Sequence, residues 1–504
     1  MKKLMILFMI TFMIFNINSK GNTTPFKHYW EMCVGSCHAY TALREDYRSQ
    51  LKKAHDELGF EYVRFHGLFN DDMGICKRRW NGETKSTYIS YNFVNSDNIF
   101  EFLLSIGMKP FIELGFMPEC LASGTKTCFH YKGNVTLPKD YEEWYKLVKA
   151  FTQHCVDRFG IDEVKTWYFE VWNEPNLDFF FDGTKEDYFE LYKHSALAIK
   201  SVNEELRVGG PATSVNAWVL DMVNYCESNN VPLDFITTHH YPSDDPLWKN
   251  QDMSLDEFWK KLGHLMGKYE RGILKKMTAR AREEAGKYPL MYTEWNTSAI
   301  IGEEQHDENY AAALVTKAIS DNDGLVEAYS YWTFTDIFEE NCQIPGEFHG
   351  GFGLQTYHGI KKPVYHSFEL LHSLGTERLE VEGYKEGDTV EVVATKVENG
   401  LSLVAFNHNV PTGEIKAEPI EIKISGIDSV SDVTVRKSDE EHANAKNVWK
   451  SLGAPEYVYG DTLKTISEKA ELVTEKPDWT LDGDELTIKV TMPEHSVYGF
   501  EIRF

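Results

Sequence analysis

Basic residues are scarce in this sequence. Its 504 residues include 52 Lys and Arg against 78 Asp and Glu, which gives a formal net charge of −26. Nucleic-acid backbones and anionic membranes are bound through clustered Lys and Arg side chains, so this balance argues against either as a partner. A polysulfated substrate is disfavoured for the same reason, though more weakly.

Metal-binding motifs are missing as well. The sequence contains no CxxC pair and no HExxH, and the adjacent His239 and His240 would point to opposite faces of a strand. We therefore expect no metal and no cofactor. The eight cysteines are Cys33, Cys37, Cys76, Cys120, Cys128, Cys155, Cys226 and Cys342. Their connectivity does not follow from the sequence, and buried free thiols are an equal alternative to disulfides.

Long apolar runs are absent except at the start of the chain. There, Lys2 and Lys3 precede an apolar segment over residues 4–15, which is too short for a permanent membrane helix and typical of a secretory signal. We predict a signal peptide over residues 1–20, cleaved near residue 20. The mature protein would then be secreted or periplasmic, with no membrane anchor.

What the sequence does have is a long alternation of short β-branched or aromatic runs with helical stretches, the pattern of repeated βα units. Eight strand-like runs lie at residues 28–35, 61–67, 109–116, 166–175, 207–214, 235–242, 289–298 and 327–334. Eight repeats predict an α/β fold, a (β/α)₈ TIM barrel over residues 21–375. Barrels of this kind carry their catalytic groups at the C-terminal ends of the strands.

The pattern changes after about residue 375. Residues 388–409 and 484–504 alternate polar and apolar side chains, and turn residues recur. This predicts an accessory antiparallel β-sandwich over residues 376–504. Its role is interpreted as structural, with a sugar-binding module as the alternative.

Two carboxylates end strand-like runs. Glu174 lies in TWYFEVWNEPN (166–176) and Glu294 in YPLMYTEWNTS (288–298), the fourth and seventh runs. A charge at the end of a strand that is buried on both faces usually has a task. Hydrolysis of a glycosidic bond requires two such acids facing each other, one to protonate the leaving oxygen and one to attack or stabilise the anomeric carbon. The pair therefore indicates a glycosidase.

With the barrel placed, the sequence resembles glycoside hydrolase family 39, the β-xylosidase and α-L-iduronidase group. The resemblance covers most of residues 28–375 and is carried, in order, by HYWEMCVGSCHAYTALREDY, EYVRFHGLFNDDM, VWNEPN, TTHHYP, YTEWNTS, YWTFTDIFEE and FHGGFGL. It implies a retaining mechanism with Glu174 as general acid/base and Glu294 as nucleophile. The last two motifs are closer to the xylosidase branch.

The resemblance also implies which side chains contact the sugar. These are His66, Asn173, His239, Tyr241, Trp332, Glu339 and Glu340. By period two, His239 and Tyr241 share one face of the sixth strand-like run. Three segments depart from the family pattern, namely GSCHA with Cys37, KTCF with Cys128 and NCQIPGE (341–347). They leave the barrel intact and the sugar specificity open.

The function predicted first is therefore an exo-acting β-xylosidase that releases terminal xylose from xylo-oligosaccharides, as in xylan degradation. An α-L-iduronidase or an α-L-arabinopyranosidase is the alternative within the family. A uronate would require a cation, preferably Arg, and no RR or KR cluster occurs in the loops after the fourth, sixth, seventh and eighth strand-like runs, where the notable basic residues are Lys249 and Lys361/Lys362. A non-catalytic carbohydrate-binding protein is the alternative from another class. Association into a homo-oligomer is left open.

Overall fold

The computed structural model describes residues 12–244, 257, 260, 268–340 and 346–504. Chain contacts divide it into two units. One contains residues 29–306 and 321–359, and the other contains residues 1–28, 307–320 and 360–504. No helix within the described part of the chain combines the length and apolarity needed to cross a bilayer.

The first unit is a closed parallel barrel, and each of the eight predicted strand-like runs supplies one of its strands. In chain order the strands are β3 (Cys33–His38), β4 (Tyr62–His66), β7 (Lys109–Leu114), β10 (Tyr168–Val171), β11 (Arg207–Thr213), β12 (Phe235–His240), β13 (Leu290–Trp295) and β14 (Ala328–Tyr331). The ring closes where β14 pairs with β3. The predicted (β/α)₈ barrel is therefore confirmed.

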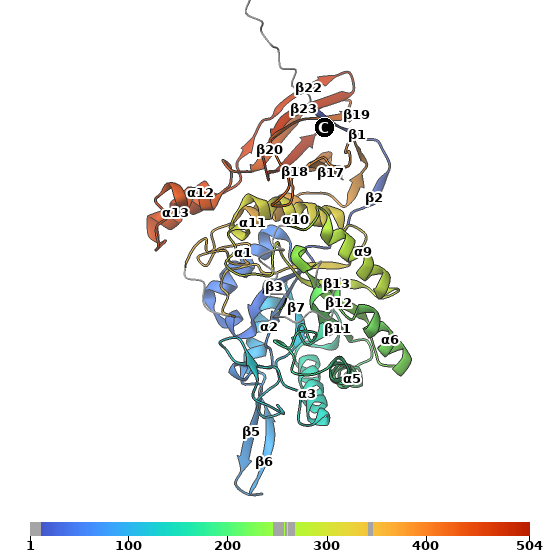
Figure 1. Ribbon diagram of the computed structural model, residues 1–504, viewed down its shortest axis with the longest axis vertical. Coiled ribbons are helices and arrows are strands. Elements are labelled where there is room, and N and C mark those ends of the chain that lie inside the picture. Colours follow the sequence, from blue (N-terminus) through green and yellow to red (C-terminus); the bar gives the residue numbers. More distant parts are fainter. Residues whose placement is uncertain (1–11, 245–256, 258–259, 261–267, 341–345) are drawn as a thin grey trace, which may run out of the picture. The chain divides into compact units, whose positions relative to one another are not determined.

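Helices follow these strands along the chain and surround the barrel (Figure 1). They are α1 (Glu45–Leu58), α2 (Val94–Ser105), α3 (Tyr141–Phe159), α4 (Ile161–Val164), α5 (Lys185–Val202), α6 (Val219–Asn229) and α9 (Ile273–Ala285). Short helical turns are η1 (Ala39–Leu43), η2 (Asp71–Met73), η3 (Ser214–Asn216), η4 (Pro242–Asp244) and η5 (Glu304–Asp307). Local chemistry fixes their ends, as where Thr184 and Asp187 form a capping box at the start of α5.

Two hairpins interrupt the regular βα alternation, and the sequence pattern did not predict them. The first, β5 (Cys76–Asn81) with β6 (Ser86–Tyr91), lies between β4 and α2 and extends away from the barrel (Figure 1). The second, β8 (Thr127–Cys128) with β9 (Gly133–Asn134), lies between β7 and α3. Both therefore belong to loops that leave the C-terminal ends of barrel strands.

The second unit is built on two sheets. A five-stranded sheet has the order β16 (Val381–Glu382), β1 (Met13–Asn18), β19 (Glu418–Ser425), β23 (Glu485–Met492), β22 (Asp478–Asp482). A seven-stranded sheet has the order β2 (Thr23–Pro25), β15 (Glu377–Leu379), β17 (Val390–Val397), β18 (Gly400–Asn407), β24 (Val497–Arg503), β20 (Asp432–Ser438), β21 (Thr474–Glu475). Buried aliphatic side chains of both sheets, such as Ile422 and Leu403, form one core.

This unit also differs from the predicted sandwich in its helices. It contains α10 (Asn309–Asp321, through Ser320) and α11 (Pro363–His372), which follow the seventh and eighth barrel strands in the sequence. It also contains α12 (Ala445–Ser451) and α13 (Gly460–Lys469), which the strand pattern did not predict. The second unit therefore includes residues 307–320 and 360–375, which the sequence pattern had assigned to the barrel.

The N-terminal strand bears on the predicted signal peptide, which stays a prediction. Residues Met13–Asn18 pair in parallel with β19 along six residues, and Phe15 and Ile17 are buried in the core of the unit. Cleavage near residue 20 would remove this strand and uncover the edge of β19. Residues 1–11 lie outside the described residues, so a shorter leader stays a prediction.

Candidate active site

The two glutamates singled out in the sequence meet in the barrel. Glu174 follows β10 and Glu294 lies within β13, with 6% and 7% of their surfaces exposed. An oxygen of each carboxyl group and a ring nitrogen of His239 all lie within 4.8 Å of one another. Two acids this close share one pocket and can act on one bond.

The backbone at Glu174 adopts an unusual conformation. Its φ is +41°, in the left-handed region that residues with a side chain rarely adopt. The turn is held because the Glu174 N–H donates to the carbonyl oxygen of Ala212 at 2.8 Å and the Leu177 N–H donates to the carbonyl of Glu174 at 3.0 Å. Such strain persists where surrounding structure enforces it, which is common at functional sites.

A hydrogen-bond donor and a cation face Glu294. The Tyr241 hydroxyl donates to Oε1 at 2.5 Å, and Nη1 of Arg64 lies 3.7 Å from Oε2. Burial raises the pKa of Glu294, while the charges of His66 and Arg64 and the Tyr241 hydrogen bond act in the opposite direction. Positive charge and a donor are thus placed where a carboxylate nucleophile would need them.

Arg64 is the centre of a buried ionic network beneath the site. Its side chain is fully buried, with Nε donating to Glu170 at 2.6 Å and Nη2 lying 2.8 Å from Oδ1 of Asn173 and 2.9 Å from Oε2 of Glu113. Burial opposes its charge, but the carboxylates of Glu170, Glu113 and Glu294 raise the pKa of Arg64 above its usual value. Nε and Nη2 are therefore engaged by side chains of the protein, while Nη1 has no hydrogen-bond partner among the described residues and lies 3.7 Å from Glu294.

A chain of hydrogen bonds runs from this network to Glu174. Thr293 donates its hydroxyl proton to Glu170 at 2.7 Å, so its oxygen can only accept from His239, whose Nε2 lies 3.0 Å away. Burial, with the nearby charge of Arg64, lowers the pKa of His239 well below its usual value. A neutral His239 that carries its proton on Nε2 has a bare Nδ1, and this atom lies 3.0 Å from Oε1 of Glu174. A hydrogen bond there requires a proton on Glu174.

The pKa shift of Glu174 agrees with that proton. Burial, and then the charges of Glu294 and Asp244, raise the pKa of Glu174 well above its usual value. At Glu174 the charge of Arg64 ranks below burial and the charges of Glu294 and Asp244, whereas at Glu294 the charges of His66 and Arg64 rank directly after burial. The environments of the two carboxyl groups thus differ in the sense that a general acid and a nucleophile require.

A second group of side chains lies beside the Arg64 network. His66 donates from Nδ1 to Glu113 at 2.7 Å, while its Nε2 lies 3.5 Å from Glu340 and its ring lies 4.7 Å from that of Trp332. Burial alone would lower the pKa of His66, but the Glu113 carboxylate outweighs burial and raises it. Burial raises the pKa of Glu340 to about 8, although His66 acts against this shift.

The arrangement can be compared with known proteins. The family model for glycosyl hydrolases family 39 matches residues 13–485 of this chain. The chain belongs to glycoside hydrolase family 39. The match begins at Met13, the first residue of β1, and it runs through the barrel into the second unit.

Relatives within and around family 39 cover nearly the whole chain. A beta-xylosidase of Caldicellulosiruptor saccharolyticus is 48% identical over 94% of this chain and 95% of its own length. A beta-xylosidase of Geobacillus stearothermophilus is 36% identical over 97% of this chain and 95% of its own length. The crystal structure of a monomeric beta-xylosidase from Caulobacter crescentus CB15 superposes with a TM-score of 0.84 at 29% identity, covering 97% of this chain and 99% of that one.

Most of the side chains that the family 39 resemblance implied lie together in the structure. His239 contacts Glu174 and Tyr241 contacts Glu294, so the shared face expected from period two is present. His240 points elsewhere, to the Tyr329 hydroxyl at 2.7 Å.

Asn173 and the adjacent glutamates need separate description. Oδ1 of Asn173 is bonded to Arg64, while its Nδ2 has no hydrogen-bond partner among the residues that the structure describes. Glu340 faces His66, whereas Glu339 forms an ion pair with Nη1 of Arg44 at 2.8 Å. Of these two acids, the structure places only Glu340 against the described pocket residues.

The sequence interpretation did not single out Arg64 and also missed three further buried residues of this site. Glu113 in β7, Glu170 in β10 and Thr293 in β13 complete the network around Arg64. The sequence did mark Glu113 and Glu170 as unusual, because a charge inside an apolar strand requires a partner. Thr293 carried no such signal.

The site residues also bear on the expectation that no metal is needed. Ligand atoms of Glu174, His239 and Glu294 are close enough to hold a cation. The hydrogen bonds described above already account for the short distances among these three side chains without a metal ion. The expectation that no metal takes part in the reaction stays a prediction.

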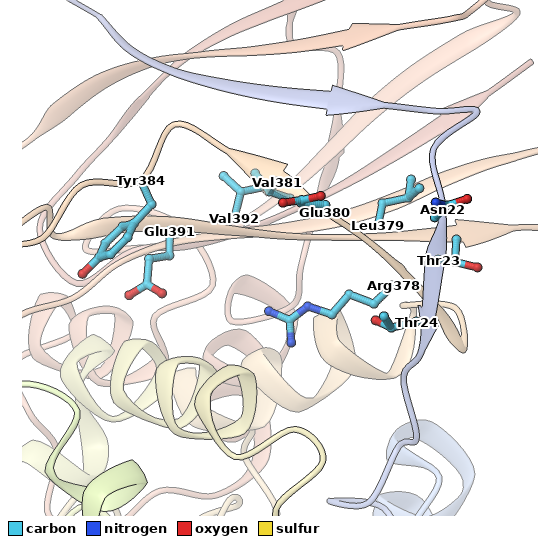
Figure 2. Close-up of a pocket in the computed structure, with 10 residues that line it drawn as sticks. All are labelled: Asn22, Thr23, Thr24, Arg378, Leu379, Glu380, Val381, Tyr384, Glu391 and Val392. Atoms are coloured by element: carbon cyan, nitrogen blue, oxygen red, sulfur yellow. The ribbon is translucent and has the colours of Figure 1, made fainter.

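The second unit has a hollow of its own, about 470 Å³ in volume (Figure 2). Arg378, Tyr384 and Glu391 point to the same side of the sheet there. Arg378 donates to Ser320 and Glu391 pairs with Lys317 at 3.0 Å, so both charged groups are engaged by α10. We assign no ligand to this hollow, and sugar binding by the second unit stays a prediction.

Proposed function

We propose that this family 39 glycoside hydrolase is a retaining exo-β-xylosidase that releases terminal xylose by double displacement. One observation carries the assignment of roles: neutral His239, fixed by Thr293, presents a bare nitrogen to Glu174. This makes Glu174 the acid/base and Glu294 the nucleophile. Their oxygens lie within 4.8 Å, closer than the roughly 6.5 to 9.5 Å that an inverting enzyme requires to admit water.

In the first step, Glu294 attacks the anomeric carbon while Glu174 transfers its proton to the departing glycosidic oxygen. A covalent glycosyl ester forms on Glu294, and the aglycone leaves as a neutral alcohol. Tyr241 and Arg64 hold the carboxylate before attack. Asn173 has a free Nδ2 donor beside the acid, placed to bond a sugar hydroxyl.

In the second step, the ester is hydrolysed. Esterification removes the negative charge of Glu294, which is one of the causes that raise the pKa of Glu174. Glu174, now a carboxylate, takes a proton from water as the water attacks the anomeric carbon. Two inversions give net retention, and both carboxyl groups return to their starting states.

A neutral sugar is supported by the charges of the pocket. Arg64 is fully buried, its Nε and Nη2 are bonded to Glu170, Asn173 and Glu113, and its Nη1 lies 3.7 Å from Glu294, so this cation is placed to hold the nucleophile rather than a uronate. Glu113 and Glu170 add negative charge around it. The names of the relatives support xylose among the neutral sugars. The α-L-iduronidase and α-L-arabinopyranosidase alternatives become outcomes of the test.

The test is hydrolysis of aryl β-xyloside, α-L-arabinopyranoside, β-glucoside and α-L-iduronide, with NMR used to identify the anomer of the first product. We expect β-xyloside to be cleaved fastest, with retention. Glu294→Ala should abolish turnover, and azide should restore it to give the inverted α-azide. A preference for a different sugar would overturn only the assignment of xylose as the substrate. Inverted sugar from the wild type would overturn the mechanism, and no cleavage of any glycoside would favour a carbohydrate-binding protein.

We also propose that the apolar N-terminal run directs export, with any cleavage before Met13. The apolar sequence supports export, and the place of β1 in its sheet limits the cleavage point. N-terminal sequencing of protein from the culture medium and the cell fractions of the source organism tests both. Protein found only in the cytoplasm, or a mature chain that lacks residues 13–18, would contradict the proposal.

A further inference from the structure

Two cysteines that the catalytic site does not use lie side by side in the barrel unit. Cys76 begins β5 and Cys120 lies in the loop after β7, and their sulfur atoms are 3.3 Å apart. The chain between them is 44 residues long. Cys128 is the cysteine nearest to Cys120 along the sequence, whereas folding brings Cys120 to Cys76.

We propose that Cys76 and Cys120 form a reversible disulfide that joins the β5–β6 hairpin to the loop after β7. The separation of the sulfur atoms requires them to approach by about 1.3 Å to reach the S–S bond length of roughly 2.0 Å. Both lie on loops rather than in barrel strands, so the closure would be absorbed outside the closed sheet.

The two thiols differ in exposure, and this difference indicates which of them reacts first. Cys76 is 2% exposed, whereas Cys120 is partly accessible. Cys120 would attack a small disulfide such as oxidised glutathione, releasing one glutathione and forming a mixed disulfide. Cys76 would then attack the sulfur of Cys120 and release the second glutathione. Two protein thiols are oxidised by two electrons, one disulfide is reduced, and the two thiol protons end on the two released glutathiones.

Charges around the pair agree with this order. The hydrogen bond from Cys76 lowers the pKa of Cys120, and the cations of Arg78 and Lys77 act in the same sense. Burial and Asp71 act against them, although Asp71 is paired with Lys77 at 2.7 Å. Thiolate is the attacking form, so Cys120 is the better nucleophile of the two.

The bond would constrain a loop that reaches the catalytic pocket. Ten residues beyond Cys120, the His130 N–H donates to the carbonyl oxygen of Glu340 at 3.1 Å. The next residue, Tyr131, stacks on His38 with ring centroids 3.9 Å apart. The Arg78 side chain, on the hairpin, already donates to the carbonyl oxygen of Cys120 at 2.9 Å. A disulfide would add a covalent tie where the hairpin and this loop already meet.

The experiment equilibrates the purified full chain in glutathione buffers of defined ratio, traps free thiols by alkylation at low pH, and maps tryptic peptides without reduction. Cleavage after Lys77, Lys126 and Lys132 places Cys76, Cys120 and Cys128 on separate peptides. We expect a peptide linked through Cys76 and Cys120 to accumulate with the fraction of oxidised glutathione and to disappear with dithiothreitol. Oxidation should also raise the Tm by several degrees, because closing a loop of this length restricts the unfolded chain.

Cys76→Ser and Cys76→Ala/Cys120→Ala should lose both the linked peptide and the rise in Tm, while the control Cys226→Ser keeps both. Cys226 lies on α6, away from the pair. Mapping of the wild type alone decides the proposal if a variant fails to fold. Separate alkylation of Cys76 and Cys120 under excess oxidised glutathione would overturn it, as would a link from Cys120 to any other cysteine.

Discussion

The hydroxyl oxygen of Thr293 lies 3.0 Å from Nε2 of His239 while its proton is donated to Glu170. A hydroxyl has one proton, so this geometry leaves the imidazole as the donor in the His239–Thr293 bond. The tautomer of a catalytic-site histidine is therefore set by a threonine that is fully buried. The nitrogen left without a proton is the one that faces Glu174.

Thr293→Val tests this relationship, because valine keeps the shape and lacks the hydroxyl. We expect kcat to fall about 10- to 100-fold with little change in KM. Without the fixed tautomer, the protonated form of Glu174 loses a hydrogen bond, so its pKa falls and the basic limb of the pH profile moves to lower pH. Thr293→Ser should restore the wild-type profile. An unchanged basic limb in Thr293→Val would contradict the assignment.

Glu174→Ala should separate substrates by their leaving groups. The general acid is needed most when the departing oxygen is a strong base, so we expect a loss of about 10²- to 10⁴-fold on xylobiose. An aryl xyloside with a nitrophenolate of low pKa should form its glycosyl ester at a near wild-type rate, measured as a burst of phenolate. Equal losses on both substrates would indicate that Glu174 is not the acid.

The pH dependence of stability should reveal the buried carboxyl of Glu340. Its pKa is about 8 in the fold, against an ordinary value of 4.5. Between these values the folded protein holds a proton that the unfolded chain releases, so the free energy of unfolding falls as pH rises. The full effect is on the order of 5 kcal/mol, reached above pH 8.

Glu340→Gln should therefore flatten the fall of Tm between pH 5 and pH 9. The fall does not vanish, because Asp244, buried with a pKa of about 8, titrates in the same range. Glu339→Gln is the matched control, since Glu339 is paired with Arg44 outside this cluster. Calorimetry of both variants decides the point: identical slopes would show that Glu340 is not the group responsible.

Gly35→Ala tests the position of Trp332. A Cβ at Gly35 would lie 2.5 Å from Cε3 of the indole, so the ring must shift away. We expect kcat/KM to fall about 10- to 100-fold, since small displacements of substrate-positioning groups are costly. Gly82→Ala is the control, because a Cβ there meets nothing within 4 Å. Wild-type kinetics in Gly35→Ala would show that the indole does not position the sugar.

Truncation tests the place of β1. A chain that begins at Met13 should unfold like the full chain, whereas one that begins at Gly21 loses Phe15, Ile17 and the six-residue pairing with β19. Loss of two buried side chains of this size costs about 4 to 9 kcal/mol. Calorimetry should show this loss in the unit that contains β1. Equal stability of the two truncated chains would mean that β1 is dispensable.

The sequence by itself determined the barrel and the positions of its two acids. Each barrel strand is a short apolar run followed by a helix, and such local periodicity survives in any context. Glu174 and Glu294 end two of these runs, and parallel strands in a closed ring bring their ends to one rim. Their meeting follows from topology alone. The same reasoning placed His239 and Tyr241 together, because side chains alternate along a strand.

Only the tertiary structure decided which partners these groups have. Glu339 and Glu340 are neighbours in sequence, yet one pairs with Arg44 and the other faces His66. The segment at Met13–Asn18 reads as part of an apolar leader until its pairing with β19, about 400 residues away, is known. Thr293 acquires its role from His239 and Glu170, which come from other strands. Such contacts depend on sub-ångström placement of side chains across the barrel, and local sequence patterns carry no information about it.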